Sequence, residues 1–288
     1  MQGTVDGFSY GLVTPLVAYL MACLGGALGL RCTTRSMLVG NSWRPGWLAL
    51  GAAAIGSGIW TMHFIAMMGF KVEQSPIHYD MATTFASLGV AIVMVGIGIF
   101  IVGYKGTTGA PLMTGGAITG LGIASMHYLG MAGMRLNGKL EYNTLTVAAS
   151  VVIAVVAATT ALWAAGQVRG FLWSVGASLV MGLAVSGMHY TGMAALKVHL
   201  HGTAAPTAGD SPASLLAPLM IGPLAFLLLA AVVVMFDPLM VMGKPVWTSA
   251  ENKPGVPARE LVTHPPARRP SFRTPRPLGH HDRTPQKR

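Results

Sequence analysis

Three segments of the sequence repeat a pattern of histidine and methionine, two residue types that bind soft metal ions. They read GSGIWTMHFIAMMG at 56–69, GLGIASMHYLGMAG at 120–133 and GLAVSGMHYTGMAA at 182–195. Each places Gly seven residues before the histidine, Met directly before it, an aromatic residue directly after it and Met four residues after it. Small residues recur at the third and sixth positions after the histidine. The histidines are 64 and 62 residues apart, so one repeat is long enough for a pair of helices.

Helical spacing predicts that these side chains gather into metal sites. A histidine and the methionine four residues later share one helix face, and the preceding methionine either flanks the same site or reaches toward a neighbouring helix. The candidate metal ligands are therefore Met62, His63, Met67, Met126, His127, Met131, Met188, His189 and Met193. Imidazole and thioether groups are neutral, and soft sulfur donors favour Cu(I). A monovalent ion would leave a single charge to bury, so copper is the predicted metal.

Other roles for the motif remain open from the residues alone. A haem held by two of the histidines would leave the repeated methionines unexplained, so haem is less favoured than copper. A second alternative is that the histidines carry protons or form hydrogen bonds, since ionisable residues inside membranes are usually functional. Methionine is also an adaptable packing residue, so a purely structural motif is the third alternative.

The elements that position the motifs are long apolar stretches. Hydrophobic residues make up 52% of the 288 residues and charged residues 10%, whereas soluble domains have about 25% charged residues. Seven stretches are long enough to span a bilayer as helices: about 10–30, 46–70, 82–103, 111–134, 146–166, 170–196 and 213–236. The predicted fold class is an all-α polytopic membrane protein with seven transmembrane helices built from two-helix repeats. The motif helices run in one direction, which places the three histidines at one depth.

Loop charges predict the orientation in a bacterial plasma membrane. The loops after the first, third and fifth stretches carry basic residues without acids: Arg31, Arg35, Arg44, Lys105 and Arg169. The positive-inside rule then places the N-terminus outside and the C-terminus in the cytoplasm. The first stretch lacks a basic leader and is predicted to be a retained helix. Cys23 and Cys32 lie at different depths of it and are predicted to be unpaired thiols.

The sequence divides into a membrane domain, residues 1–243, and a tail, residues 244–288. The tail has ten basic and three acidic residues and nine prolines, a composition that predicts a disordered cytoplasmic segment. Its charge suits an anionic lipid surface or a signalling partner, and nucleic acid is not an expected partner.

A second repeated element precedes the third and fifth stretches, as His78-Tyr79-Asp80 and Glu141-Tyr142-Asn143. The third motif has no evident counterpart after it.

The motifs resemble the MHYT domain, a bacterial integral-membrane sensor module named for Met-His-Tyr-Thr. Residues 188–191 spell that name, and the resemblance covers residues 10–240. It implies a seven-helix sensor that binds copper through the motif residues and senses a diatomic gas such as O₂, CO or NO. Family members often carry cytoplasmic output domains. Only the tail follows the last stretch here, so output through a partner protein or through a change in assembly is expected.

Two function classes follow, and a third is disfavoured. A metal-dependent membrane sensor is the favoured function, and copper transport or handling is the alternative. The sequence contains no recognisable acid–base pair, nucleophile triad or phosphate loop, so the chain is not expected to be an enzyme. The expected surroundings are the lipid bilayer, with a diatomic gas as a possible ligand.

Overall fold

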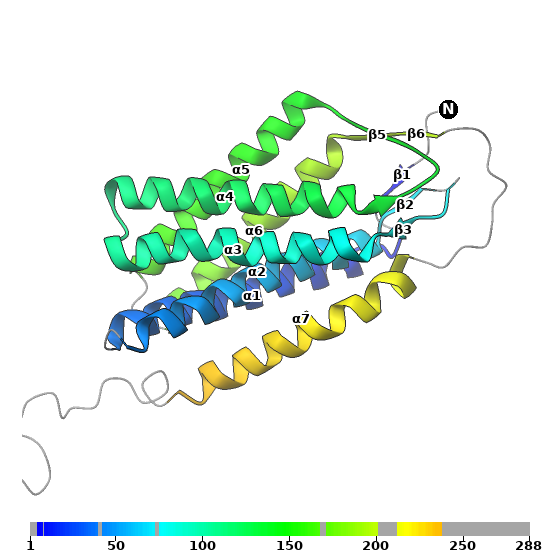
Figure 1. Ribbon diagram of the computed structural model, residues 1–288. Coiled ribbons are helices and arrows are strands. Elements are labelled where there is room, and N and C mark those ends of the chain that lie inside the picture. Colours follow the sequence, from blue (N-terminus) through cyan, green and yellow to red (C-terminus); the bar gives the residue numbers. More distant parts are fainter. Residues whose placement is uncertain are drawn as a thin grey trace, which may run out of the picture. The chain divides into compact units, whose positions relative to one another are not determined.

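The computed structural model describes residues 5–7, 9–39, 42–72, 75–167, 171–200 and 212–237. Seven long helices make up most of this part (Figure 1). They are α1 (Val13–Leu38), α2 (Arg44–Met68), α3 (Met81–Lys105), α4 (Gly109–Ala132), α5 (Thr144–Gln167), α6 (Phe171–Ala194) and α7 (Pro212–Met235). The predicted all-α membrane fold is therefore confirmed. The predicted tail, residues 244–288, lies outside the described residues.

Six of the seven described helices are long and apolar enough to cross a membrane, and α4 is the exception. Its 24 residues would still reach about 36 Å at 1.5 Å per residue. Its mean hydropathy is lowered by glycine, serine and threonine, which membrane helices use for close packing. Because α4 packs between α3 and α5, its helix neighbours supply the apolar surroundings that its own sequence lacks.

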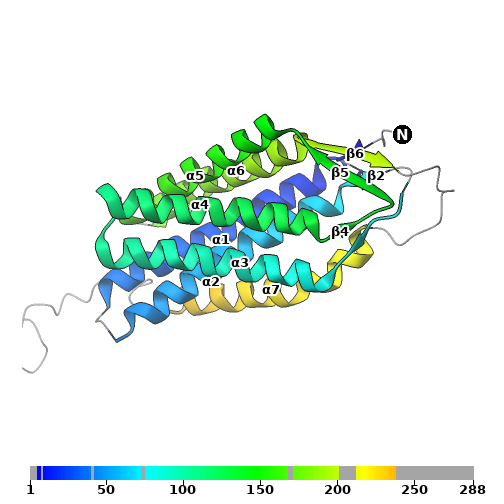
Figure 2. The same cartoon turned by 45° about the horizontal axis from the view of Figure 1, so that its top comes forward.

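Helices α1 to α6 form a closed ring. Each packs against the next along the chain, and α6 packs against α1. Helix α7 lies outside the ring against α1 and α2, as the two views of Figures 1 and 2 show. The ring has the threefold character that the motif repeat predicts, because the helix pairs α1–α2, α3–α4 and α5–α6 take equivalent places in it. The motif helices α2, α4 and α6 therefore alternate with α1, α3 and α5.

Short strands close each helix pair at one end of the bundle. They are β1 (Val5–Asp6), β2 (Lys71–Val72), β3 (His78–Tyr79), β4 (Met134–Arg135), β5 (Gly138–Tyr142) and β6 (Leu196–Leu200). β1 pairs with β2, β3 with β4 and β5 with β6, all antiparallel. The repeat unit is therefore strand–helix–helix–strand. The sequence did not predict these strands, because segments of two to five residues are too short to show a periodic pattern.

This pairing corrects the interpretation of the second repeated element. In each strand pair, the residue eight positions after the motif histidine faces one residue of the opening strand. The facing pairs are Lys71 with Asp6, Arg135 with His78 and Lys197 with Glu141. Asp6, His78 and Glu141 are therefore equivalent. The element thus opens each repeat instead of following it. All three repeats have a counterpart, which in the first repeat begins at Asp6.

A backbone hydrogen bond recurs at the small residue six positions after each histidine. The carbonyls of these residues accept from the backbone N–H groups that open each repeat: Ser9 to Gly69 at 3.1 Å, Asp80 to Gly133 at 2.8 Å and Asn143 to Ala195 at 2.9 Å. At these positions the chain leaves the motif helix. The bond holds the end of each motif helix to the start of its own repeat.

The glycine seven residues before each histidine permits close helix approach between repeats. A Cβ atom on Gly56 would lie 2.9 Å from the backbone of Ile92 in α3, and one on Gly120 would lie 2.4 Å from Val155 Cα in α5. A Cβ on Gly182 would lie 2.5 Å from Cys23 Sγ in α1. Each motif helix therefore uses its glycine to contact the following repeat, and the third contact closes the ring.

Helix α1 is longer than predicted and carries charges that were assigned to a loop. It continues to Leu38, so Arg31 and Arg35 lie in its last turns. The first extended backbone follows at Val39. Arg35 Nε donates to Asp237 Oδ2 at 2.9 Å, directly after α7, and the Arg35 guanidinium lies 5.3 Å from the Trp47 ring centre. The ion pair ties the end of α7 to the ring. Cys23 and Cys32 are both free and buried, as predicted.

Replacing Asp237 with asparagine is expected to loosen α7. The side chains of Arg35 and Asp237 are 11% and 8% exposed, so the substitution leaves a largely buried guanidinium without its counter-charge. Loss of a hydrogen bond to a charged group predicts a cost on the order of 2–3 kcal/mol. Thermal unfolding in detergent, read by circular dichroism, would measure it. Lys105→Gln, an exposed cation at the same end of the ring, is the control, and an equal melting temperature in the two variants would contradict the prediction.

Asp80 makes the start of α3 sensitive to acid. Hydrogen bonds from the Thr83 side chain and from the Thr83 backbone N–H, which donates to Asp80 Oδ1 at 2.7 Å, lower the pKa of the Asp80 carboxyl. A lowered folded-state pKa adds stability that is present above the unfolded value of about 4 and is lost as pH falls through the folded value. The melting temperature should therefore fall below about pH 4 more steeply in the wild type than in Asp80→Asn. Identical pH profiles would contradict this role.

Candidate metal centre

The three motif histidines converge at the centre of the helix ring. His63 comes from α2, His127 from α4 and His189 from α6, and each is 1% exposed. Their Nδ1 atoms are 3.1 Å apart between His63 and His189, 3.2 Å between His127 and His63, and 3.3 Å between His189 and His127. The histidines therefore share one depth, as the repeat predicted.

The rings present their Nδ1 edges to one point. The ring centres are 4.9 to 5.1 Å apart, farther than the nitrogens, and the planes cross at 76° to 89°. The centre of a triangle with sides of 3.1 to 3.3 Å lies about 1.8 Å from each corner, close to a Zn–N bond of about 2.0–2.1 Å. The three imidazoles can thus bind one metal ion of ordinary size without moving apart.

Hydrogen bonding among the rings is a poorer explanation of this triangle. A good N–H···N bond needs the hydrogen to point directly at its acceptor. The three contacts are within hydrogen-bond distance, but each Nδ1 lies 3.1 to 3.3 Å from both of the others, so a single hydrogen on it cannot point directly at both neighbours. If all three carry their hydrogen on Nε2, three lone pairs face each other. A cation at the centre turns that repulsion into attraction.

The outer ring nitrogens pack against small residues of the next repeat. A Cβ on Gly130 would lie 2.7 Å from His63 Nε2, and one on Gly192 would lie 2.5 Å from His127 Nε2. Both glycines stand three residues after a motif histidine, so each ring occupies the space of the missing side chain. Within the described residues, His63 Nε2 and His127 Nε2 are buried without a hydrogen-bond partner. The sequence showed the small residue at this position but not its partner ring.

The predicted methionine ligands lie in the same core. Five are buried to 1% exposure or less, namely Met62, Met67, Met126, Met131 and Met188, and Met193 is partly buried against that cluster. Burial suits both thioether ligation and apolar packing. The triangle therefore brings together the three predicted histidines, and ligation by the methionines stays a prediction.

Aromatic residues surround the triangle on its strand-bearing side. Each histidine meets the aromatic residue that follows it edge-on, with ring centres 4.6 Å apart for Phe64, 4.8 Å for Tyr128 and 5.0 Å for Tyr190. Tyr128 shares a 2.6 Å hydrogen bond with Ser150. Next to Phe64 and Tyr128 lie Tyr79 and Tyr142, at 6.2 and 5.8 Å.

The outer tyrosines are held neutral. Burial raises the pKa of Tyr79 well above its ordinary value. Burial, followed by the neighbouring Tyr128, raises the pKa of Tyr142 to about 12. Both phenols therefore remain uncharged at physiological pH. The sequence indicated these tyrosines only as part of a repeated element, without their position against the motif aromatics.

A family described as "Bacterial signalling protein N terminal repeat", the MHYT repeat, matches residues 56–115 and 120–178. The two matches begin at the glycines that precede the first two motif histidines by seven residues. This chain belongs to the MHYT family. It is a multi-pass membrane protein whose related proteins act in signalling.

Three relatives share this MHYT region. The chain is 37% identical over 67% of its length to the bifunctional diguanylate cyclase/cyclic di-GMP phosphodiesterase MucR of Pseudomonas aeruginosa. It is 36% identical over 68% to the cyclic di-GMP phosphodiesterase NbdA of the same species, and 29% identical over 66% to the signalling protein YkoW of Bacillus subtilis. The matches cover 29%, 26% and 24% of these relatives, so the chain spans under a third of their length. No solved structure matches the chain.

Proposed function

We propose that this MHYT protein is a membrane-embedded sensor whose three motif histidines bind one copper ion. The observation that carries the proposal is the buried triangle of Nδ1 atoms, with sides of 3.1 to 3.3 Å. Bound at its centre, Cu(I) would supply a soft, electron-rich site able to bind a small diatomic gas. His63, His127 and His189 would hold the ion, and the motif methionines are the proposed further ligands.

The surroundings favour a monovalent soft ion over a divalent one. The nearest groups are neutral imidazoles, aromatic rings and thioethers, and the described residues of α2, α4 and α6 include no carboxylate. A divalent ion would bring two positive charges into this core without a counter-charge, at a higher desolvation cost. Sulfur donors also favour Cu(I). Copper therefore fits this donor set better than zinc or magnesium.

The proposed signal passes from the metal to the cytoplasm. We place the N-terminus outside and the C-terminus inside, where the basic tail could dock on anionic lipid or on a signalling partner. MucR and NbdA are named for cyclic di-GMP turnover, and an analogous output through a partner is part of this proposal. The chain itself is proposed to be a sensor and not an enzyme.

Copper transport is the weaker alternative. A transport path needs further ligands beyond the first site. On the side of the triangle away from the strands, one turn below the histidines, lie the apolar side chains of Ile59, Ile123 and Val185. These branched hydrocarbons offer no donor to an ion leaving the triangle. The geometry therefore suits retention of the metal.

Elemental analysis of detergent-purified protein tests the proposal. The wild type, loaded with Cu(I) under reducing conditions, should retain about one copper per chain through gel filtration. The triple variant His63→Ala/His127→Ala/His189→Ala should retain none while eluting at the same volume. Equal copper in both proteins would refute the site. An absorption spectrum of the untreated protein would reveal haem, which would refute copper as the cofactor.

A further inference from the structure

A small apolar cavity lies inside the helix ring directly beneath the histidine triangle. Its volume is about 30 Å³, enough for one or two molecules the size of water. All six ring helices contribute to its wall. The residues four positions before the three histidines, Ile59, Ile123 and Val185, all line it. Four residues of helix span about 6 Å, so the cavity begins one turn below the metal ligands.

The cavity wall suits an apolar molecule better than water. Only two of the lining side chains carry a hydroxyl, Thr33 and Thr119. The Thr33 hydroxyl already donates to the Gly29 carbonyl at 2.9 Å, which leaves Thr119 as the one free hydroxyl among the described lining residues. A buried water needs two to four polar partners, whereas dry cavities of this kind take up apolar gases.

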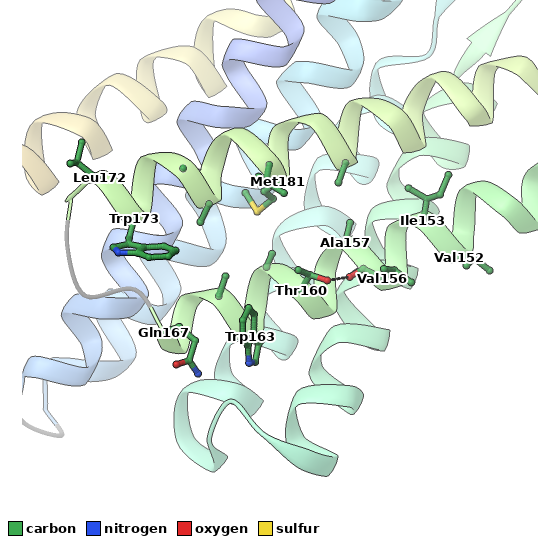
Figure 3. Close-up of a pocket in the computed structure, with 16 residues that line it drawn as sticks. Val152, Ile153, Val156, Ala157, Thr160, Trp163, Gln167, Leu172, Trp173 and Met181 are labelled. Atoms are coloured by element: carbon green, nitrogen blue, oxygen red, sulfur yellow. Dashed lines mark hydrogen bonds between the residues drawn. The ribbon is translucent and has the colours of Figure 1, made fainter.

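A second hollow lies between this cavity and the lipid, separated from the cavity by a thin wall. A groove of about 1050 Å³ runs between α5 and α6 (Figure 3). Its rim is open to the membrane, since Val152, Val156 and Val180 are 60%, 59% and 64% exposed. Ala157, Ala161 and Met181 line both the groove and the cavity. The wall between them is therefore two alanines of α5 and one flexible methionine of α6.

The groove lies where the third repeat departs from the other two. Two glycines stand twelve and five residues before the motif histidine in each of the first two repeats. They are Gly51 and Gly58 in α2, and Gly115 and Gly122 in α4. A Cβ atom added to any of the four would lie 3.1 Å or less from an atom of the preceding helix. The equivalent residues of α6 are Ala177 and Ala184, and both line the groove. The extra methyl groups stand where α5 would otherwise approach, so this helix pair alone is held open.

We infer that the groove and cavity form a lipid-side route by which a small apolar gas reaches the histidine triangle. The occupant is a diatomic molecule that dissolves in the lipid tails, and the inference rests on the proposed function for the metal that it would meet. Met181 is the movable element of the route, because it is 7% exposed, lies between the two hollows and has an unbranched side chain. Figure 3 shows it on the side of α6 that faces Ala157.

Dissolved oxygen tests the route in metal-free protein. O₂ is paramagnetic and speeds the relaxation of methyl groups that it approaches. In lipid nanodiscs under oxygen, the methyl groups of Met181, Ile59 and Ile123 should relax at least about threefold faster than that of Ile77, which is buried but lines neither hollow. Rates no faster than that of Ile77 would overturn the inference, whether or not the protein binds copper.

A plug in the groove tests the route in copper-loaded protein. Ala161→Phe adds its ring to the shared wall, where the groove has room, and Val93→Phe adds the same bulk on the lipid face of α3 as the control. Carbon monoxide rebinding after flash photolysis should slow at least about fivefold in Ala161→Phe and stay unchanged in Val93→Phe. Equal rates in both variants would overturn the route. Failure of the wild type to bind copper would count against the proposed function alone, and the oxygen experiment would then decide the route.

Discussion

His127→Ala should lower the affinity for Cu(I) at least about a hundredfold, because loss of even an outer-shell partner of a metal ligand costs about 10–100-fold. The substitution removes one corner of a triangle whose other two nitrogens, on His63 and His189, remain 3.1 Å apart. Two imidazoles can still bind Cu(I), but without the third donor at the same depth. Competition with a coloured Cu(I) chelator in detergent measures the affinity.

Two further variants make this experiment specific. His199→Ala is the matched control, since His199 lies on β6 with its side chain 42% exposed and paired with Glu141 at 3.2 Å. It should bind Cu(I) like the wild type. Met131→Leu keeps the side-chain volume and removes the sulfur, so a drop in affinity would identify the thioether as a ligand. Wild-type affinity in His127→Ala would contradict the three-histidine site.

Gly120→Ala should destabilise the ring by an amount on the order of 3 kcal/mol, the upper range for an overpacked core. The new methyl group would lie 2.4 Å from Val155 Cα, 2.7 Å from Val155 N and 2.8 Å from the Ala154 carbonyl oxygen. All three are backbone atoms, so no rotamer change relieves the contact. Helices α4 and α5 must separate, and α4 also carries His127. The variant should therefore melt at a lower temperature and bind less copper.

Gly89→Ala is the control for this substitution. Gly89 lies within α3, and an added Cβ would meet no atom within 4 Å. Alanine in place of a helical glycine is favourable by about 0.5–1 kcal/mol. The control should therefore melt at or above the wild-type temperature. Equal melting of the two alanine variants would show that close approach of α4 to α5 is not needed for the fold.

The repeat alone was sufficient to predict most of the candidate metal centre. Equal spacing of Met, His and aromatic residues on alternate helices implies that the histidines share one depth and direction, and the structure confirms that they meet. The methionine four residues after each histidine was equally visible, but spacing along one helix cannot tell a thioether that faces a metal from one that packs against a neighbouring helix. The predicted methionine ligands therefore still await the binding experiments.

Contacts between segments far apart in the chain could not be obtained from the pattern. The strand pairs that close each repeat join residues about 60 positions apart, such as Val5 and Val72, and strands this short carry no periodicity. The ion pair between Arg35 and Asp237 depends on the path of α7 around the ring. The small residue three positions after each histidine was plain in the sequence, but the imidazole that packs against Gly130 or Gly192 comes from another repeat.

Local chemistry therefore accounts for the helices, their order and the residue types that form the histidine triangle, since each depends on neighbours within a few turns. Ring closure, the Nδ1 triangle and the hollow beside α6 depend on which helices meet. Whether two helices pack closely depends here on the presence or absence of single methyl groups. Gly56, Gly120 and Gly182 lack a side chain and let successive repeats touch, whereas Ala177 and Ala184 face an open groove. The effect of glycine or alanine at such a position can be predicted only when the position of the opposing helix backbone is known.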